Sequence, residues 1–312
     1  MFETGGMKIK RIVQLLVQLA VLSGIIYYFF QRRDELSNLW DVGLLDVVSV
    51  LGLAFLGSII RSWQLFYMVH SLDGKLSFVD SIFITTSTTL LNQLPMNTGT
   101  IFKAGILKKH YSIKYAHFIS ITGAAALLIL ISGGILGLMA VIFSGLELKI
   151  NNITLIGIFV VSIIASVTMF CIPSSLIKNN SNWIKTAIKD LLIGLELIKR
   201  NGRLLLVLLA LTASTLLTAA LRLWVCFHAM NTKVSISSCI LFAVIGNLLA
   251  IVNIVPGSLG LREILIGATA QFTGFSFDGG LFAAALDRIF SLILTVSMGL
   301  PSLVMLKVKK LI

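Results

Sequence analysis

Four arginines stand inside apolar stretches of this sequence: Arg61, Arg222, Arg262 and Arg288. Insertion scales put an Arg at the centre of a bilayer at about 2.5–3.5 kcal/mol, so each is expected to face a polar cavity or a partner. A guanidinium is planar and binds a carboxylate or phosphate through two parallel hydrogen bonds. These residues therefore predict an anion site in apolar surroundings. The alternative, strongest for Arg61, is that their side chains snorkel to the membrane surface.

Two carboxylates, Glu263 and Asp287, are the only acidic residues deep in apolar sequence, and each adjoins an arginine. One interpretation is that they are structural counter-charges to the arginines. The other is that one of them gains and loses a proton as part of the function. Lys103 is a further cation that we expect to contribute to the anion site.

A proline and glycine pattern, N-x-x-P-x-x-x-G, occurs twice and ends an apolar segment each time. Proline removes an N–H group and disfavours helix at the residue before it, while glycine permits a close approach of the backbone. The helix that restarts beyond has free N–H groups and the positive end of its dipole, so two such ends would bind an anion without a metal. The residues are Asn92, Pro95 and Gly99 in the first copy, and Asn253, Pro256, Gly257 and Gly260 in the second.

The two copies belong to a longer repeat. An Arg-x-Trp element precedes each, and 222 − 61, 224 − 63, 256 − 95 and 260 − 99 all give 161. The alternative is coincidence in low-complexity apolar sequence. Internal repeats are common in transporters, so we interpret the chain as two copies of one unit.

Composition indicates the class of protein. The 312 residues are 57% hydrophobic and 12% charged, with a mean hydropathy of +0.99. A soluble domain carries about a quarter charged residues. We expect a single all-α integral membrane domain over residues 1–312. The net charge of +12 fits membrane orientation rather than nucleic-acid binding. The three Cys are expected to be buried thiols, and no metal, cofactor or catalytic spacing is found, so an enzyme is not expected.

Charge placement decides the topology. If every apolar segment crossed the membrane, the basic clusters at 103–114 and 178–203 could not share a side with the N-terminus. Re-entrant hairpins at 78–107 and 235–273, entering from opposite faces, restore the positive-inside rule. Both termini are then cytoplasmic. Six full spans remain, at about 12–30, 44–68, 118–143, 153–173, 204–229 and 280–306.

This topology makes the repeats inverted. Repeat 1 covers about 44–143 and repeat 2 about 204–306, and their Arg-x-Trp helices run in opposite directions. Between them, residues 178–203 carry apolar side chains at helical spacing among lysines and arginines. That pattern predicts an amphipathic helix on the membrane surface.

Two segments resemble a known family. L-P-M-N-T-G-T-I-F-K (Leu94 to Lys103) and V-P-G-S-L-G-L-R-E (Val255 to Glu263) are similar to the paired signatures of the flippase-like family, which includes the membrane domain of lysylphosphatidylglycerol synthases. The R-S-W around Arg61 and A-A-A-L-D-R-I-F around Arg288 fit the same pattern. The resemblance covers about 10–306 and implies translocation of an aminoacylated, polyprenyl-linked or glycosylated lipid.

The first repeat departs from the family pattern. Thr100 stands where an acidic residue is usual, and 118–143 carries no charge where an Arg is frequent. The first half of the site is therefore expected to be less polar. No stretch resembles the soluble aminoacyl-transferring domain, so we do not expect this chain alone to synthesise lysylphosphatidylglycerol.

Three functional hypotheses follow. The leading one is a flippase or transporter of the cytoplasmic membrane that moves an anionic phospholipid or a polyprenyl- or glyco-lipid headgroup. The second is a non-catalytic partner that positions a lipid or polysaccharide biosynthetic enzyme through the basic helix at 182–200. The third, an enzyme acting on a lipid phosphate, lacks a recognisable nucleophile with its base. The expected partner is a membrane lipid, with no nucleic acid.

Overall fold

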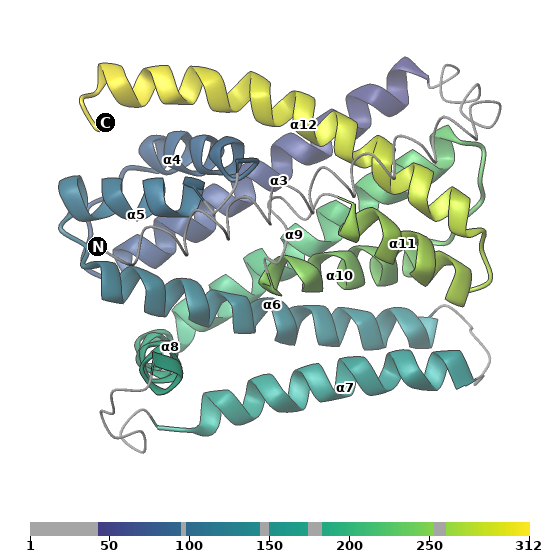
Figure 1. Ribbon diagram of the computed structural model, residues 1–312, viewed down its shortest axis with the longest axis horizontal. Coiled ribbons are helices and arrows are strands. Elements are labelled where there is room, and N and C mark those ends of the chain that lie inside the picture. The colour runs from purple at the N-terminus through teal and green to yellow at the C-terminus, as the bar shows by residue number, and fades with distance from the viewer. Residues whose placement is uncertain (1–42, 95–97, 144–149, 174–182, 253–259) are drawn as a thin grey trace, which may run out of the picture.

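The computed structural model describes residues 43–94, 98–143, 150–173, 183–252 and 260–312, and within them every regular element is a helix. Figure 1 shows most of these helices lying along one common direction, with α8 running across it. The helices are α3 (Leu44–His70), α4 (Phe78–Leu91), α5 (Thr98–Tyr111), α6 (Tyr115–Phe143), α7 (Ile150–Cys171), α8 (Trp183–Lys199), α9 (Gly202–Ala229), α10 (Ile236–Val252), α11 (Leu261–Phe272) and α12 (Phe277–Val308).

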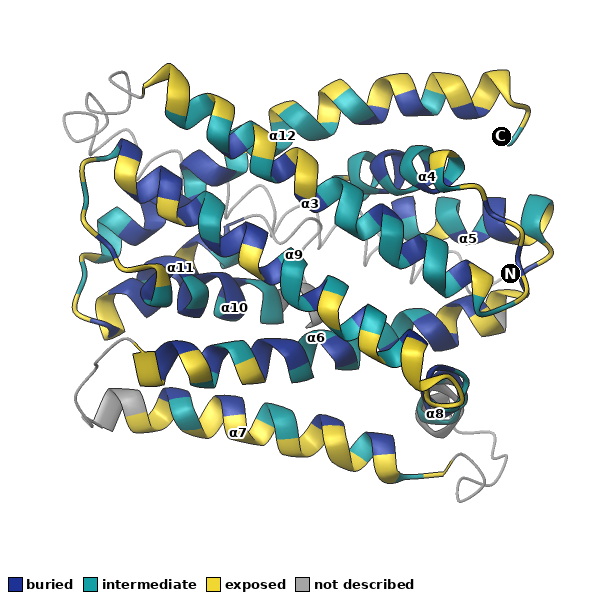
Figure 2. Cartoon of the chain, turned by 180° about the vertical axis from the view of Figure 1, so that it is seen from behind, coloured by how far each residue is buried: buried dark blue, intermediate teal, exposed yellow. Residues whose placement is uncertain are grey.

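Five of the described helices, α3, α6, α7, α9 and α12, are long and apolar enough to cross a membrane. They contain 22 to 32 residues, which at 1.5 Å per residue is about 33–48 Å against a hydrocarbon core of about 30 Å. Figure 2 shows exposed residues along the outer faces of α7 and α12, and these include the apolar Val161 and Val304. The protein is a polytopic helical membrane protein, as predicted. The expected first span at 12–30 lies outside the described residues.

Four short helices form two pairs. α4 and α5 have 14 residues each, and α10 and α11 have 17 and 12, fewer than the roughly 20 that a spanning helix needs. Figure 1 shows α4 and α5 at one end of the molecule and α10 and α11 toward the other. Each pair folds back on itself, so the predicted hairpins at 78–107 and 235–273 appear as α4–α5 and α10–α11.

The two halves run in opposite directions. In Figure 1 α3 ends at the side where α4 and α5 lie, whereas α9 ends at the side where α10 begins. α3 and α9 contact each other, and Gln64 Nε2 donates a hydrogen bond to Thr212 Oγ1 at 3.2 Å. The hairpin helices also keep the repeat offset, since Leu91 and Tyr111 end α4 and α5 and Val252 and Phe272 end α10 and α11. The arrangement is therefore that of inverted repeats.

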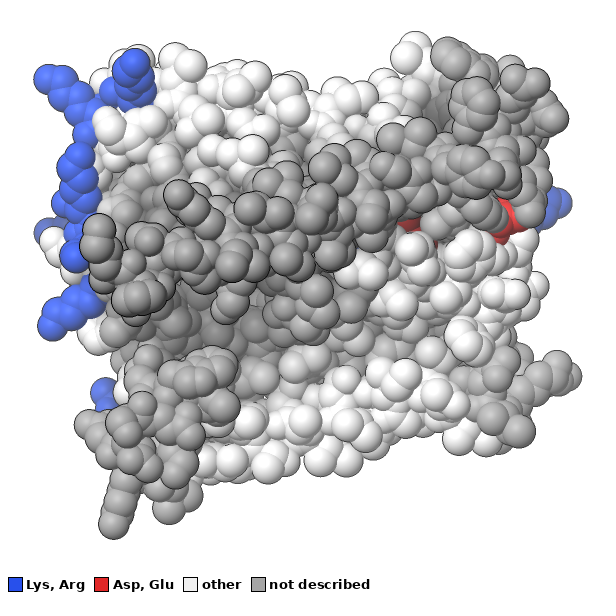
Figure 3. All heavy atoms as spheres, in the orientation of Figure 1, with Lys and Arg blue, Asp and Glu red and all other residues white. Residues whose placement is uncertain are grey.

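Basic side chains collect at one end of the molecule. Figure 3 shows Lys and Arg along the edge where, in Figure 1, α5 and the C-terminus lie. We call this the basic end. Lys309 Nζ there pairs with Asp80 Oδ1 at 2.5 Å, which ties the end of α12 to the start of α4. The asymmetry is the one expected from the sequence.

Helix α8 corrects one expectation. It is amphipathic and lies across the basic end, but its apolar face packs against protein. Leu192, Leu195 and Ile198 are at most 1% exposed, and a Cβ at Gly194 would lie 2.1 Å from the carbonyl oxygen of Ser120 on α6. The apolar stripe that predicted a helix on the membrane surface is thus covered by α6, because a glycine lets α6 approach closely enough.

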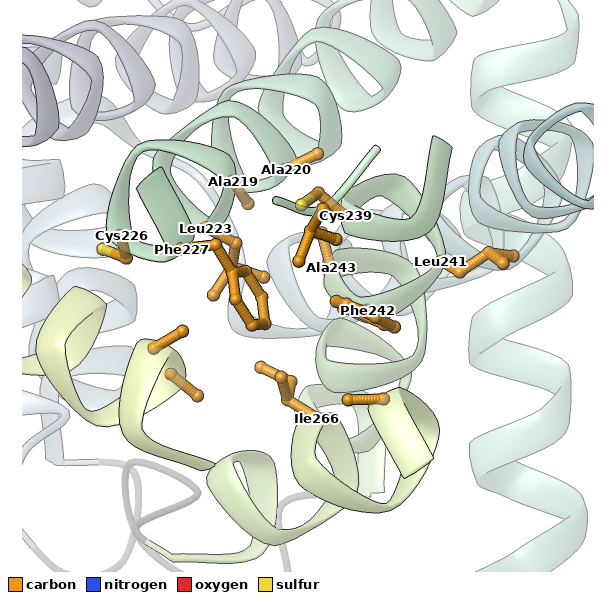
Figure 4. Packing of buried hydrophobic residues seen from close by; sticks show 14 of the residues in the cluster. Ala219, Ala220, Leu223, Cys226, Phe227, Cys239, Leu241, Phe242, Ala243 and Ile266 are labelled. Carbon is orange, nitrogen blue, oxygen red and sulfur yellow. The ribbon is translucent and has the colours of Figure 1, made fainter. Parts of the chain in front are cut away.

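The largest core cluster holds the second hairpin in place. Figure 4 shows Phe227 of α9, Phe242 of α10 and Ile266 of α11 gathered between these helices. The rings of Phe227 and Phe242 are 5.8 Å apart. Cys226 and Cys239 are buried in this cluster, as expected, but Cys171 at the end of α7 is exposed. A position in an apolar span therefore did not imply burial, because spans also expose residues to lipid.

Candidate functional site

The first hairpin is closed by Asn92 and Gly99. Asn92 Oδ1 accepts a hydrogen bond from the backbone N–H of Thr100 at 3.0 Å, in the first turn of α5. A Cβ on Gly99 would lie 2.1 Å from the carbonyl oxygen of Thr88 and 2.7 Å from Asn92 Oδ1. Both residues thus hold the two short helices together. Pro95 lies outside the described residues.

The second hairpin restarts at Gly260, whose φ of +82° is a conformation that side chains disfavour. Its N–H donates to Glu263 Oε2 at 2.8 Å. Glu263 is thereby fixed over the start of α11, as a residue three positions into a helix often is. Its other oxygen, Oε1, lies 3.7 Å from Arg288 Nη1. Asn253, Pro256 and Gly257 lie outside the described residues.

Asp287 is a fully buried carboxylate shared by two arginines. Its Oδ1 lies 2.9 Å from Arg222 Nε and its Oδ2 lies 2.9 Å from Arg262 Nη2. The three residues come from α9, α11 and α12, so this ion-pair cluster joins the second hairpin to two spans. Removing one partner from a buried pair typically costs about 3–5 kcal/mol, because the other charge is left uncompensated. Glu263 and Asp287 thus act as counter-charges in this structure.

All four arginines line one cavity of about 160 Å³. They arrive from four helices, α3, α9, α11 and α12. Against their four positive charges stand Asp287 and Glu263, so the described residues leave a formal excess of two positive charges. We call this space the arginine cavity. The rest of its lining is Thr89, Gln93, Asn247, Ser291, Leu292 and Thr295.

Arg61 is the arginine of this cavity that no carboxylate of the described residues approaches within ion-pair distance. Its Nε is buried and has no hydrogen-bond partner there. The alternative that Arg61 reaches the membrane surface is not what the structure shows. Its guanidinium is therefore the one best placed to receive an incoming anion.

Lys103 lies elsewhere. It sits on α5 with its Nζ 5.2 Å from the centre of the Phe118 ring of α6, and it does not line the arginine cavity. The structure thus places Lys103 outside the arginine cavity, because that face of α5 turns toward α6.

The sequence analysis missed the uncharged polar lining. Ser291 and Thr295 follow Asp287 at intervals of four, so all three lie on one face of α12. Gln93 follows Thr89 at the same interval, across the end of α4. A search for polar residues four apart in apolar helices would have found both pairs. Asn247 of α10 has no such companion; its Nδ2 donates to the Ala243 carbonyl at 2.7 Å.

With this geometry in view, comparison with known proteins is informative. The sequence model of the family described as Lysylphosphatidylglycerol synthase TM region matches residues 15–299. The chain belongs to this family. The match includes all four arginines and both hairpins, so it confirms the resemblance seen at the two signatures. The protein is therefore a flippase-like membrane domain of the lysylphosphatidylglycerol synthase kind.

A curated relative supports the same assignment over a shorter stretch. A UPF0104 membrane protein of Methanothermobacter thermautotrophicus is 40% identical over 80 residues. The match covers 25% of this chain and 22% of the relative. The chain thus matches about a fifth of that protein's length, and the rest of the relative has no counterpart in the match.

Proposed function

We propose that this protein is a lipid flippase of the cytoplasmic membrane that moves an anionic phospholipid or a polyprenyl- or glyco-lipid headgroup between leaflets. The observation that carries the proposal is the convergence of four arginines on one polar cavity between two inverted hairpins. Isolated buried arginines are costly, and this excess of positive charge has a clear use if a lipid phosphate neutralises it. The lipid tails stay in the bilayer while the headgroup occupies the cavity.

The exchange of partners supplies a mechanism. Asp287 pairs with Arg222 and Arg262, while Arg61 has no carboxylate partner among the described residues. A phosphate would meet Arg61 first and could then share the guanidinium groups that Asp287 holds. Thr89, Gln93, Asn247, Ser291 and Thr295 offer hydroxyl and amide groups to the rest of a polar headgroup. Because these residues belong to both halves, rocking of one half against the other would open the cavity to each leaflet in turn.

The charge asymmetry supports the orientation. We infer that the basic end faces the cytoplasm, because loops rich in Lys and Arg stay on that side. Lys108 and Lys109 at the end of α5 and Lys307 and Lys309 at the end of α12 lie there.

We also infer that transport proceeds without covalent chemistry. Among the described residues, the cavity lining includes the hydroxyls of Thr89, Ser291 and Thr295, but neither a histidine nor a lysine to serve as their base. The alternative function, positioning of a lipid or polysaccharide biosynthetic enzyme, would use the polar face of α8. It does not explain why the four arginines face one cavity.

A reconstituted translocation assay tests the proposal. Proteoliposomes would carry fluorescent phosphatidylglycerol or phosphatidylcholine, and a membrane-impermeant quencher would report the lipid that reaches the outer leaflet. We expect Arg61→Gln to slow phosphatidylglycerol movement at least tenfold without loss of thermal stability, because this residue has no carboxylate to leave unpaired among the described residues. Arg222→Gln should slow it as well and also lower stability.

The matched control is Arg203→Gln, which removes an exposed arginine from the same helix as Arg222. It should leave the rate unchanged. Equal rates for wild type, Arg61→Gln and protein-free vesicles with every lipid offered would contradict the flippase and favour the positioning role.

A further inference from the structure

A second cavity lies at the basic end, on helices that do not line the arginine cavity. It is a groove of about 670 Å³ between α5, the start of α6 and the last residues of the chain. We call it the α5 groove. This volume lies within the range of about 300–1,000 Å³ typical of small-molecule sites. Its lining is Phe102, Gly105, Ile106, Lys108, Lys109, Tyr115, Leu311 and Ile312.

The groove is amphipathic along its length. Phe102, Ile106 and Lys109 lie on one face of α5, and Lys109 is about 10 Å further toward the basic end than Phe102. The apolar residues therefore lie deeper in the molecule and the lysines at its surface. Leu311 and Ile312 add apolar surface from the end of the chain. An occupant must be apolar at its inner end and anionic at its outer end.

The lysines at the rim are available. Lys108 and Lys109 are exposed, and no carboxylate of the described residues pairs with them. Lys309, by contrast, is occupied by Asp80. Lys108 Nζ lies 4.5 Å from the centre of the Tyr115 ring. A tyrosine beside a lysine is a frequent arrangement where a protein meets lipid headgroups.

We propose that the α5 groove binds one anionic phospholipid from the leaflet at the basic end, separately from the lipid carried through the arginine cavity. Its acyl chain lies against Phe102, Ile106 and Leu311, and its phosphate is held by Lys108 and Lys109. The two sites share no lining residue. This lipid would tie α5 to α6 and to the end of the chain, and it would not be moved between leaflets.

Gly105 permits a direct test. A Cβ added there would meet only Tyr115 Oη, at 4.0 Å, so a leucine at this position would fill the groove without pushing on backbone. The size control is Gly157→Leu on α7, where an added Cβ meets nothing within 4 Å. The charge control for Lys108→Gln/Lys109→Gln is Lys75→Gln/Arg200→Gln, because both of those residues are exposed and neither lines the groove.

The measurement is native mass spectrometry of the full chain released from nanodiscs that contain equal amounts of phosphatidylglycerol and phosphatidylcholine. We expect wild type and both controls to retain one phosphatidylglycerol in preference to phosphatidylcholine. Each lysine near an anionic lipid contributes about fivefold, so the double lysine variant should lose about 25-fold in that preference. Gly105→Leu should retain one phosphatidylglycerol fewer than wild type while keeping the thermal stability of wild type.

Three results would overturn the proposal. Unchanged retention in Gly105→Leu would mean that the lipid lies outside the groove. An equal loss in Lys75→Gln/Arg200→Gln would mean that diffuse positive charge, and not the groove, holds it. Retention of neither lipid by wild type would mean that no anionic lipid is bound there. Every variant leaves the four cavity arginines in place, so translocation can be measured on the same proteins. A failure of the proposed translocation can therefore be told apart from a failure of lipid binding in the α5 groove.

Discussion

The two hairpins share one plan but contribute different chemistry to the arginine cavity. The α10–α11 half supplies Arg262 and Glu263 from the hairpin and Asp287 and Arg288 from the span that follows. At the same offset of 161, the α4–α5 half has Ile101, Phe102, Ala126 and Leu127. Among the charged residues of the cavity, only Arg61 and Arg222 stand at matching positions of the two halves. Inverted halves thus need not be equal partners: one carries three of the four arginines and both carboxylates, and the other supplies Arg61, packing and the polar side chains of Thr89 and Gln93.

The most damaging change should be Asp287→Ala in the charged half. It leaves the buried guanidinium groups of Arg222 and Arg262 without their carboxylate, so we expect a loss of about 3–5 kcal/mol in the free energy of unfolding. Thermal unfolding in detergent would measure it. Its counterpart in the other half, Ala126→Ser, should change stability little. If both variants have the melting temperature of wild type, the ion-pair cluster does not hold the second half in place.

The paired glycines should fail for different reasons. Gly99→Ala brings a Cβ against the carbonyl oxygen of Thr88, and overpacking of this kind costs about 1–3 kcal/mol. Gly260→Ala instead forces a side chain into a φ of +82°, at about 1–2 kcal/mol. Gly52→Ala in α3, where a Cβ meets nothing within 4 Å, is the control. Melting temperatures should decrease in the order Gly52→Ala, Gly260→Ala, Gly99→Ala. A reversed order of the last two would show that the backbone of the first hairpin adjusts to the added Cβ.

The smallest effect should come from the cap of the first hairpin. Asn92→Ala removes the acceptor of the Thr100 N–H and should cost about 0.5–2 kcal/mol. Glu263→Ala removes the acceptor of the Gly260 N–H and also the carboxylate beside Arg288, so it should cost more. Glu263→Gln keeps an acceptor oxygen and should regain part of the loss, which the melting temperature would show. The same variant addresses proton coupling. If its translocation keeps the wild-type dependence on a proton gradient, Glu263 is not the coupling carboxylate.

Charge and hydropathy were sufficient to predict the five described spans and the two hairpins. The sequence did not show which way individual polar residues face. Lys103 and Arg262 both follow a hairpin turn, yet one contacts α6 and the other lines the arginine cavity. The contact of α8 with α6 was also hidden, because an apolar stripe packs equally well on lipid and on protein. Only the three-dimensional arrangement distinguishes these cases.

In the proposed transport cycle, the charge count of the arginine cavity would make the step without lipid sensitive to the membrane potential. Over the described residues the cavity holds four arginines and two carboxylates, and each elementary charge that crosses the full field is worth about 2.3 kcal/mol per 100 mV. A headgroup with two negative charges would cancel the excess. In the proposed cycle the return of the empty cavity is therefore the step that voltage drives or opposes, while the loaded step is electrically silent. A singly charged headgroup would leave both steps responsive to voltage. The voltage dependence of transport would therefore report the charge of the lipid headgroup.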